Sequence, residues 1–185
     1  MNTNRNEGVK HPTEDKFWWL RHGEDLERDF VALCRTRFSM KVEINPSKLI
    51  DPLAPDLLVN GSIADLKTQN TPFFTAAHYQ LNPQYTVTFN RKDYERYRSR
   101  YPEIVIFYWV DWQQTTWGSV SVPHLAGIYS LPFSQISSMI DRGAPEHRYV
   151  HRRDDTLGNA KSSFLLDLRL FKDIAIDNLH NNGAL

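Results

Sequence analysis

The sequence is poor in cysteine and has no excess of either charge. Its single cysteine, Cys34, excludes an internal disulfide and is typical of a reducing compartment. Lysine and arginine together number 22, as do aspartate and glutamate, so any binding of nucleic acid must depend on local basic patches. No apolar run approaches the roughly 18 residues of a membrane helix, and the first residues lack a secretion signal. We therefore expect a soluble cytoplasmic protein with no membrane partner.

Two common catalytic signatures are also missing. The sequence has no glycine-rich phosphate loop, which argues against nucleotide hydrolysis, and no nucleophile elbow of a Ser-His-Asp hydrolase. It has no internal repeat. The first dozen residues are polar, so we expect a flexible tail over residues 1–12 and a single domain over residues 13–185.

Hydrophobic periodicity predicts a mixture of helices and strands. Apolar residues recur at helical spacing within residues 13–38, with a break expected near Gly23. Residues 104–110 are continuously apolar, which is typical of a central strand covered on both faces. The other expected elements are strands over 41–45 and 85–89, a helix from the Asn90 cap to Tyr101, strand character over 119–128, a helix over 131–140, and a closing strand or helix over 161–172. The expected fold class is α/β, with a central mixed β-sheet flanked by helices.

The segment from Ala54 to Gln69 is the most informative part of the sequence. Asp65, Lys67 and Gln69 alternate, and alternate side chains of a strand share one face. Asp56 precedes Asp65 by nine residues, and Asn60-Gly61 between them is a strong hairpin-turn signal. The pattern therefore predicts a β-hairpin that brings Asp56 beside Asp65 and Lys67.

Such a cluster of charges favours metal-assisted chemistry. Two carboxylates and an ammonium group are costly to gather at a partly buried place unless they pair or hold a metal ion. Mg²⁺ prefers oxygen ligands, often one or two carboxylates together with water and substrate phosphate. A neighbouring lysine can orient a metal-bound water and stabilise an anionic phosphorus centre. The chemistry indicated is hydrolysis of a phosphodiester.

At these residues the chain resembles the PD-(D/E)XK nuclease superfamily, which has the restriction-endonuclease-like fold. Pro55-Asp56 is similar to the PD element, and Asp65-Leu66-Lys67 to the (D/E)XK element in its aspartate form. The resemblance implies that Asp56 and Asp65 bind one or two Mg²⁺ ions, with Mn²⁺ as a substitute, and that Leu66 adds its backbone carbonyl. It also implies that Lys67 acts at the attacking water. Gln69 matches a polar residue that several members carry after the lysine, where it would orient Lys67 or touch a phosphate.

Members of this superfamily commonly carry a glutamate on the helix before the hairpin. Glu27 is the candidate, because it lies within the apolar stripe of the first predicted helix, next to Phe30. Glu24, at the edge of that stripe, is the alternative. A glutamate there could also be a surface residue that extends to solvent. Asp51 is a rival for Asp56, but it lies in a proline-rich loop.

Two basic clusters are candidates for contact with nucleic-acid phosphates. The first interleaves basic and tyrosine residues on the helix after Asn90, and the second follows residue 147. The candidate side chains are Arg91, Lys92, Arg96, Arg98, Arg100, Arg148, Arg152 and Arg153. The first cluster also fits an amphipathic cover helix whose polar face is merely solvated, and this interpretation is slightly favoured.

The resulting prediction is a metal-dependent nuclease, most simply a Mg²⁺-dependent DNA endonuclease. The expected partner is nucleic acid, with DNA favoured over RNA, and the resemblance leaves a homodimer open because many such nucleases cut both strands as dimers. The alternative is a catalytically silent protein that keeps the fold and binds nucleic acid or another protein.

Overall fold

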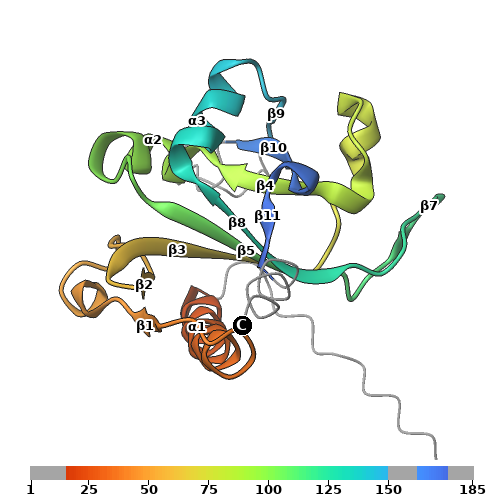
Figure 1. Ribbon diagram of the computed structural model, residues 1–185. Helices are drawn as coiled ribbons and strands as arrows, with labels where there is room; N and C mark the ends of the chain where they lie inside the picture. The colour runs from red at the N-terminus through yellow and green to blue at the C-terminus, as the bar shows by residue number, and fades with distance from the viewer. Residues whose placement is uncertain (1–15, 150–161, 175–185) are drawn as a thin grey trace, which may run out of the picture.

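The computed structural model describes residues 16–149 and 162–174 (Figure 1). Three helices lie in this part of the chain: α1 (Lys16–Arg37), α2 (Arg91–Arg100) and α3 (Phe133–Asp141). The expected tail over residues 1–12, as well as Arg152 and Arg153, falls outside the described residues. No helix in the described ranges is long and apolar enough to cross a membrane.

The centre of the fold is a mixed six-stranded sheet. Its strands, in spatial order, are β1 (Val42–Ile44), β2 (Leu57–Val59), β3 (Ser62–Gln69), β5 (Val105–Asp111), β8 (Ala126–Pro132) and β11 (Lys172–Asp173). β3 and β5 are parallel, and the other neighbouring pairs are antiparallel. This arrangement confirms the predicted α/β class with a central mixed sheet flanked by helices.

Two smaller sheets complete the β-structure. The first consists of β4 (Thr86–Asn90), β10 (Ser163–Asp167) and β9 (Glu146–His147), with β10 in the middle. The second is the short hairpin of β6 (Thr116–Trp117) and β7 (Val120–Ser121). Four 3₁₀ turns connect these elements, at Pro46–Leu49, Phe74–Tyr79, Pro83–Tyr85 and Leu168–Leu170.

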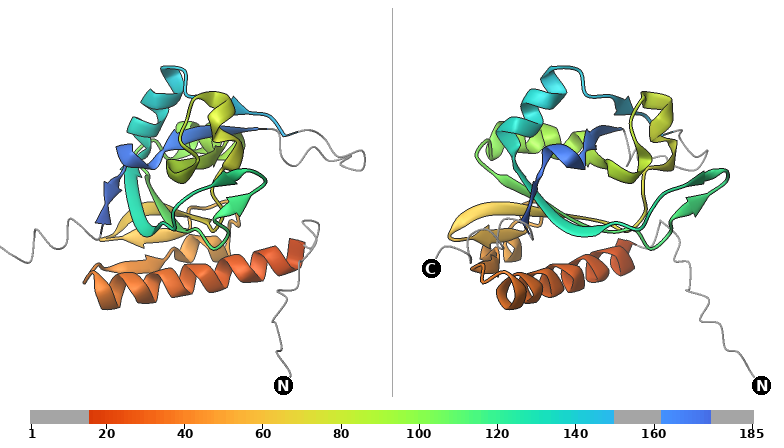
Figure 2. Two further views of the ribbon diagram at one scale, coloured as in Figure 1. Left: turned by 90° about the vertical axis from the view of Figure 1, so that its right-hand side faces the viewer. Right: turned by 45° about the vertical axis from the view of Figure 1, so that its right-hand side comes forward.

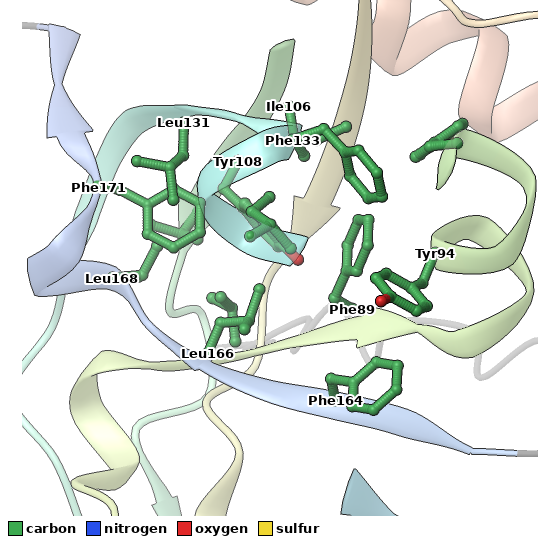
Figure 3. Close-up of a cluster of buried hydrophobic side chains, with 14 of the residues drawn as sticks. Phe89, Tyr94, Ile106, Tyr108, Leu131, Phe133, Phe164, Leu166, Leu168 and Phe171 are labelled. Carbon is green, nitrogen blue, oxygen red and sulfur yellow. The ribbon is translucent and has the colours of Figure 1, made fainter. Parts of the chain in front are cut away.

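The large sheet has a different core on each face. α1 packs on one face, where Phe30 and Cys34 are fully buried against Leu57, Leu66 and Phe107. The other face carries α2, α3 and the three-stranded sheet (Figure 2). The core on that side is rich in aromatic rings (Figure 3). Because both faces are covered, β5 is almost wholly buried, as its continuous apolar sequence predicts.

The hairpin of β2 and β3 forms in the predicted register. Leu57 pairs with Ala64, and Val59 pairs with Ser62. The two turn residues, Asn60 and Gly61, both have positive φ angles, of 51° and 84°. These angles are characteristic of a type I′ turn, whose twist matches that of the flanking strands.

Several element boundaries differ from the sequence predictions. α1 continues through Gly23 without a break, because neighbouring helical turns compensate for one glycine. The predicted helix over 131–140 begins two residues late, since Leu131 is buried in β8 opposite Ile106. The strand expected over 119–128 is divided between β7 and the start of β8.

Candidate functional site

The hairpin brings Asp56 and Asp65 together at the point where β2 begins. Extending the β2–β3 ladder by one residue beyond the Leu57–Ala64 pair places Asp56 opposite Asp65. The Leu66 amide donates a hydrogen bond to Asp56 Oδ2 at 3.3 Å. Lys67 Nζ lies 2.7 Å from Asp65 Oδ2, although Asp65 itself is 2% exposed. The predicted grouping of Asp56, Asp65 and Lys67 is therefore present.

Asn45 fixes the backbone that carries Asp56. Its side-chain amide donates to the Pro55 carbonyl at 2.8 Å, and its backbone amide donates to the Asp56 carbonyl at 2.9 Å. Asn45 is buried, and its own side-chain oxygen caps the next turn by accepting from the Ser47 amide. These bonds position the Asp56 carboxylate even though a proline-containing loop precedes it.

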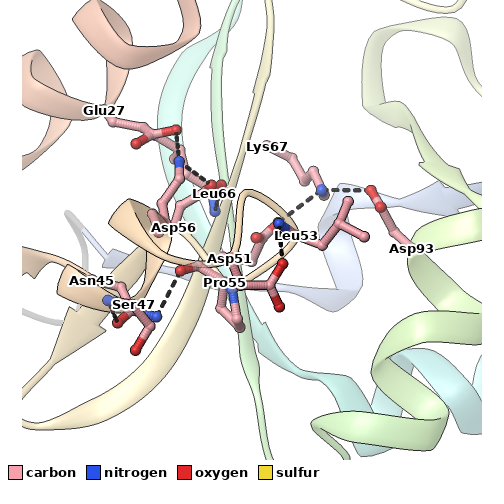
Figure 4. A network of polar contacts seen from close by, with 12 residues as sticks. Glu27, Asn45, Ser47, Asp51, Leu53, Pro55, Asp56, Leu66, Lys67 and Asp93 are labelled. Atoms are coloured by element: carbon pink, nitrogen blue, oxygen red, sulfur yellow. Dashed lines mark hydrogen bonds and ion pairs between the residues drawn. The ribbon is translucent and has the colours of Figure 1, made fainter. Parts of the chain in front are cut away.

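A lysine that the sequence analysis did not single out connects Asp56 to the first helix. Lys48 Nζ lies 2.7 Å from Asp56 Oδ1 and 2.5 Å from Glu27 Oε1 (Figure 4). All three side chains are mostly buried, with exposed fractions between 13% and 21%. Glu27 thus faces the site, as predicted, but Lys48 stands between it and Asp56. The side chain of Glu24 is outside the described part of the structure.

On its other side, Lys67 contacts α2. Its ammonium group lies 2.6 Å from Asp93 Oδ2 (Figure 4). Arg96 holds the second oxygen of Asp93 at 2.9 Å and donates to the Tyr97 hydroxyl at 2.7 Å. The sequence contains a hint that Asp93 faces inward, because it lies four residues before Tyr97 and so shares the same face of a helix.

A row of charged side chains therefore crosses the site from α1 to α2, and acids and bases alternate in it except at one place. The four carboxylates belong to Glu27, Asp56, Asp65 and Asp93, and the three cations to Lys48, Lys67 and Arg96. The cluster carries one net negative charge when every group is ionised. The two neighbouring carboxylates with no cation placed between them are Asp56 and Asp65.

The pKa values of these two carboxyl groups move apart. Burial, together with repulsion from Asp65, raises the pKa of Asp56 to about 7, and Lys48 offsets only part of this rise. Burial also raises the pKa of Asp65, but the charge and hydrogen bond of Lys67 outweigh it, so the pKa stays below its ordinary value. Burial lowers the pKa of Lys67, whereas Asp65 and Asp93 hold it well above its usual value. Lys67 is therefore an ammonium ion at any physiological pH.

The donor set fits a divalent cation between Asp56 and Asp65. Asp65 Oδ2 is buried, and its contact in the structure is the 2.7 Å ion pair with Lys67. Two carboxylates, with water and substrate oxygens, are a common ligand set for Mg²⁺. Across residues 16–149 and 162–174, no three acidic, histidine or cysteine side chains gather closely enough to hold an ion together. Lys48 lies between Glu27 and Asp56, and a part for Glu27 in the metal shell, directly or through water, remains a prediction.

Two cavities lie beside the site and share lining residues at the start of α2. One, of about 460 Å³, is lined by Lys67, Gln69, Thr88 and Tyr149 among others. The second, of about 420 Å³, lies between α2 and the loop that contains Leu53. Asn90 and Asp93 line both cavities, and Lys67 lines the larger one.

Gln69 occupies a position different from the one expected. Its amide donates to the Thr71 carbonyl at 2.9 Å, and its carbonyl accepts from the Thr88 amide at 3.2 Å. Gln69 therefore links β3 to β4, and the structure gives it no hydrogen bond to Lys67. It still lines the larger cavity, where contact with a phosphate remains a prediction.

Most of the basic residues on α2 have acidic partners. Arg91 forms a bidentate pair with Glu146, Arg98 lies 3.4 Å from Asp141, and Arg100 lies 3.7 Å from Asp51. Arg96 is likewise paired with Asp93, and both Lys92 and Arg96 line the second cavity. Arg148 is exposed, close to the Tyr149 side of the larger cavity.

Asp51, the rival of Asp56, does not join the carboxylate pair. Its side chain accepts from the Leu53 amide and lies near Arg100. The site residues are thus the ones selected from the hairpin pattern, with Lys48 and Asp93 added by the structure.

No protein-family model, no curated protein and no solved structure matches this chain.

Proposed function

We propose that the protein is a Mg²⁺-dependent nuclease of the restriction-endonuclease-like fold, acting on DNA. The observation that carries this proposal is the pairing of Asp56 with Asp65 across a hairpin whose second strand also carries Lys67. The order of elements supports it: a helix with Glu27, then a strand, then the hairpin, as the resemblance to the PD-(D/E)XK superfamily requires.

The proposed roles follow from where each atom lies. Asp56 and Asp65 would hold the ion. The ion would lower the pKa of a bound water and neutralise charge on the phosphate. Lys67 is kept protonated by Asp65 and Asp93, so it acts as an ammonium donor rather than as a general base. In that state Lys67 orients the attacking water and stabilises the negative charge that develops on phosphorus.

The test is a cleavage assay with two variants and a matched control. Asp65→Asn removes a ligand with little change in shape, and Lys67→Met removes the ammonium group. Lys41→Met removes an exposed lysine at the edge of β1, where it lies 3.7 Å from Glu43. We expect cleavage of DNA with Mg²⁺ or Mn²⁺, none with EDTA, and loss only in Asp65→Asn and Lys67→Met. Full activity in both site variants would exclude this assignment.

One observation favours a second candidate function. Lys48 and Lys67 already neutralise the carboxylates around them, so the cluster is an almost balanced ion network without any metal. Such a network could hold the layers of the fold together in a catalytically silent nucleic-acid-binding protein. In that case the wild type would bind DNA in a salt-sensitive way and yield no product with any divalent ion.

A further inference from the structure

Three large aliphatic side chains are exposed on the loop that carries Lys48. Leu49, Ile50 and Leu53 are 91%, 90% and 56% exposed. Figure 1 shows this segment at the outer edge of the large sheet, beside β1 and β2. Adjacent exposed aliphatic residues of this size are a common mark of an interaction surface.

The loop that presents these side chains is held by many bonds. Asn45 caps the turn, and the amides of Ile50 and Asp51 both donate to the Ser47 carbonyl. Lys48 anchors the turn to Glu27 and Asp56. Because the backbone is already ordered, a partner that covers the aliphatic tip pays little of the entropy cost of ordering a flexible loop.

Basic residues flank the aliphatic tip. Leu53 lines the cavity of about 420 Å³ together with Lys92, Arg96 and Arg100, and Asp93 is the one acid in that lining. Arg100 also lies 3.7 Å from Asp51, which brings the loop next to α2. Arg96 is paired with Asp93 and Arg100 with Asp51, so three cations face two carboxylates and the wall keeps a small net positive charge beside the apolar projection.

The apolar tip and the concave wall together favour one kind of binding partner over others. In a symmetric dimer the same patch meets itself, so the cations of one copy would face those of the other. A lipid surface is flat, whereas these cations line a concavity. A nucleic-acid duplex offers phosphates for the wall and stacked bases between which leucine or isoleucine can be inserted, as apolar wedges do in the minor groove.

We propose that the tip formed by Leu49 and Ile50 is a wedge that inserts between base pairs of duplex DNA, while Lys92, Arg96 and Arg100 hold the adjacent phosphates. This inference rests on the proposed nuclease function and adds to it a mode of substrate binding. Insertion of the tip from the minor groove would unstack one base step and kink the duplex toward its major groove, while the backbone next to the tip lies along the cavities lined by Lys67 and α2.

The experiment uses the full chain in EDTA, so that its result does not depend on cleavage. The probe is a short DNA duplex with 2-aminopurine, whose fluorescence rises when the base is unstacked. The variant is Leu49→Ser with Ile50→Ser, and the matched control is Leu170→Ser, which replaces another leucine that is 60% exposed. We expect the wild type and control to raise the fluorescence, and the double variant to lose this rise and bind about tenfold more weakly, equivalent to about 1.4 kcal/mol.

Equal fluorescence and affinity in the double variant and the wild type would overturn the proposal. The proposal would also be overturned if the double variant left duplex binding unchanged but abolished a dimer formed by the wild type. Loss of wild-type binding to anionic vesicles, again with duplex binding unchanged, would overturn it in the same way. The two proposals fail separately. Unstacking in EDTA without cleavage in Mg²⁺ would support the wedge and reject the nuclease. Full cleavage by the double variant, with no unstacking by the wild type, would support the nuclease and reject the wedge.

Discussion

Asp56 is the carboxylate whose charge the fold accommodates least well. It is mostly buried, lies beside Asp65 and faces Glu27 across Lys48. A pKa of about 7 means that the carboxyl group takes up a proton in the folded protein at a pH where an unfolded chain would have released it. A cation-binding site commonly has this property before it binds its ion, since the ligands repel each other.

We expect Asp56→Asn to stabilise the metal-free protein above about pH 7. Between the ordinary pKa, near 4, and about 7, folded Asp56 binds more protons than unfolded Asp56, so its contribution to stability falls as the pH rises and stays low above that window. Asparagine has no such charge, so its advantage should grow across the window and then become constant. Thermal unfolding in EDTA measures this, at roughly 2–4 °C for each kcal/mol in a chain of this size. A variant that is less stable at pH 8 would show that the pairing of Asp56 with Lys48 outweighs the repulsion.

Lys48 competes with any metal ion for the same carboxylate. Its ammonium group lies 2.7 Å from Asp56 Oδ1, so an ion that binds there must share or displace that contact. We expect Lys48→Met to bind Mn²⁺ more tightly, by roughly tenfold, because a nearby positive charge is removed and Glu27 is released. Titration calorimetry gives the affinity and the number of ions, with Lys41→Met as the control. Weaker binding would instead identify Lys48 as the residue that orients Asp56.

At the scale of elements, the hairpin could be predicted almost completely from the sequence. Alternation in β3 and the Asn60-Gly61 turn signal determined its register, because a shift by one residue would move Ala64 and Leu66 out of the core. Lys48 and Asp93 could not be predicted in this way. They contact residues 21 and 26 positions away in the chain, and local periodicity carries no information on how separate elements pack.

The sequence of α2 likewise did not show which of its basic side chains are open to a ligand. Composition predicted a basic helix, yet Arg91, Arg98 and Arg100 have acidic partners on other elements. Those partners lie on segments that the sequence analysis placed only loosely, such as β9 and the end of α3. A count of charges on one helix therefore overstates the basic surface that is open to a ligand.

The turn of the hairpin provides a test at this scale. Gly61 has a φ of 84°, and no atom lies within 4 Å of an added Cβ, so Gly61→Ala is strained by its backbone conformation alone. We expect a loss of about 1–2 kcal/mol, measured as a lower denaturant midpoint. Gly23→Ala is a control of opposite sign, since Gly23 lies inside α1 with open space around it and alanine there should stabilise by about 0.5–1 kcal/mol. A neutral Gly61→Ala would mean that the turn relaxes to another type.

At the scale of the whole molecule, the site joins the layers on the two faces of the large sheet. Its row of charged side chains begins at Glu27 on α1 and ends at Arg96 on α2, on the opposite face (Figure 2). Between these ends lie the hairpin and the loop of Lys48. Binding of an ion to Asp56 and Asp65 should therefore stabilise the packing of both layers rather than one strand pair.

The single cysteine can report this coupling without any measurement of activity. Cys34 lies on α1 and is fully buried against the sheet, and burial raises the pKa of its thiol to about 12, so a thiol reagent should label it only when α1 separates from the sheet. An ion that binds the folded hairpin lowers the population of that open state. At an Mn²⁺ concentration 100 times the dissociation constant, the gain is about 2.7 kcal/mol, so labelling should slow by about 100-fold. Asp65→Asn should abolish the protection, whereas equal labelling rates with and without Mn²⁺ in the wild type would show that ion binding does not hold α1 on the sheet.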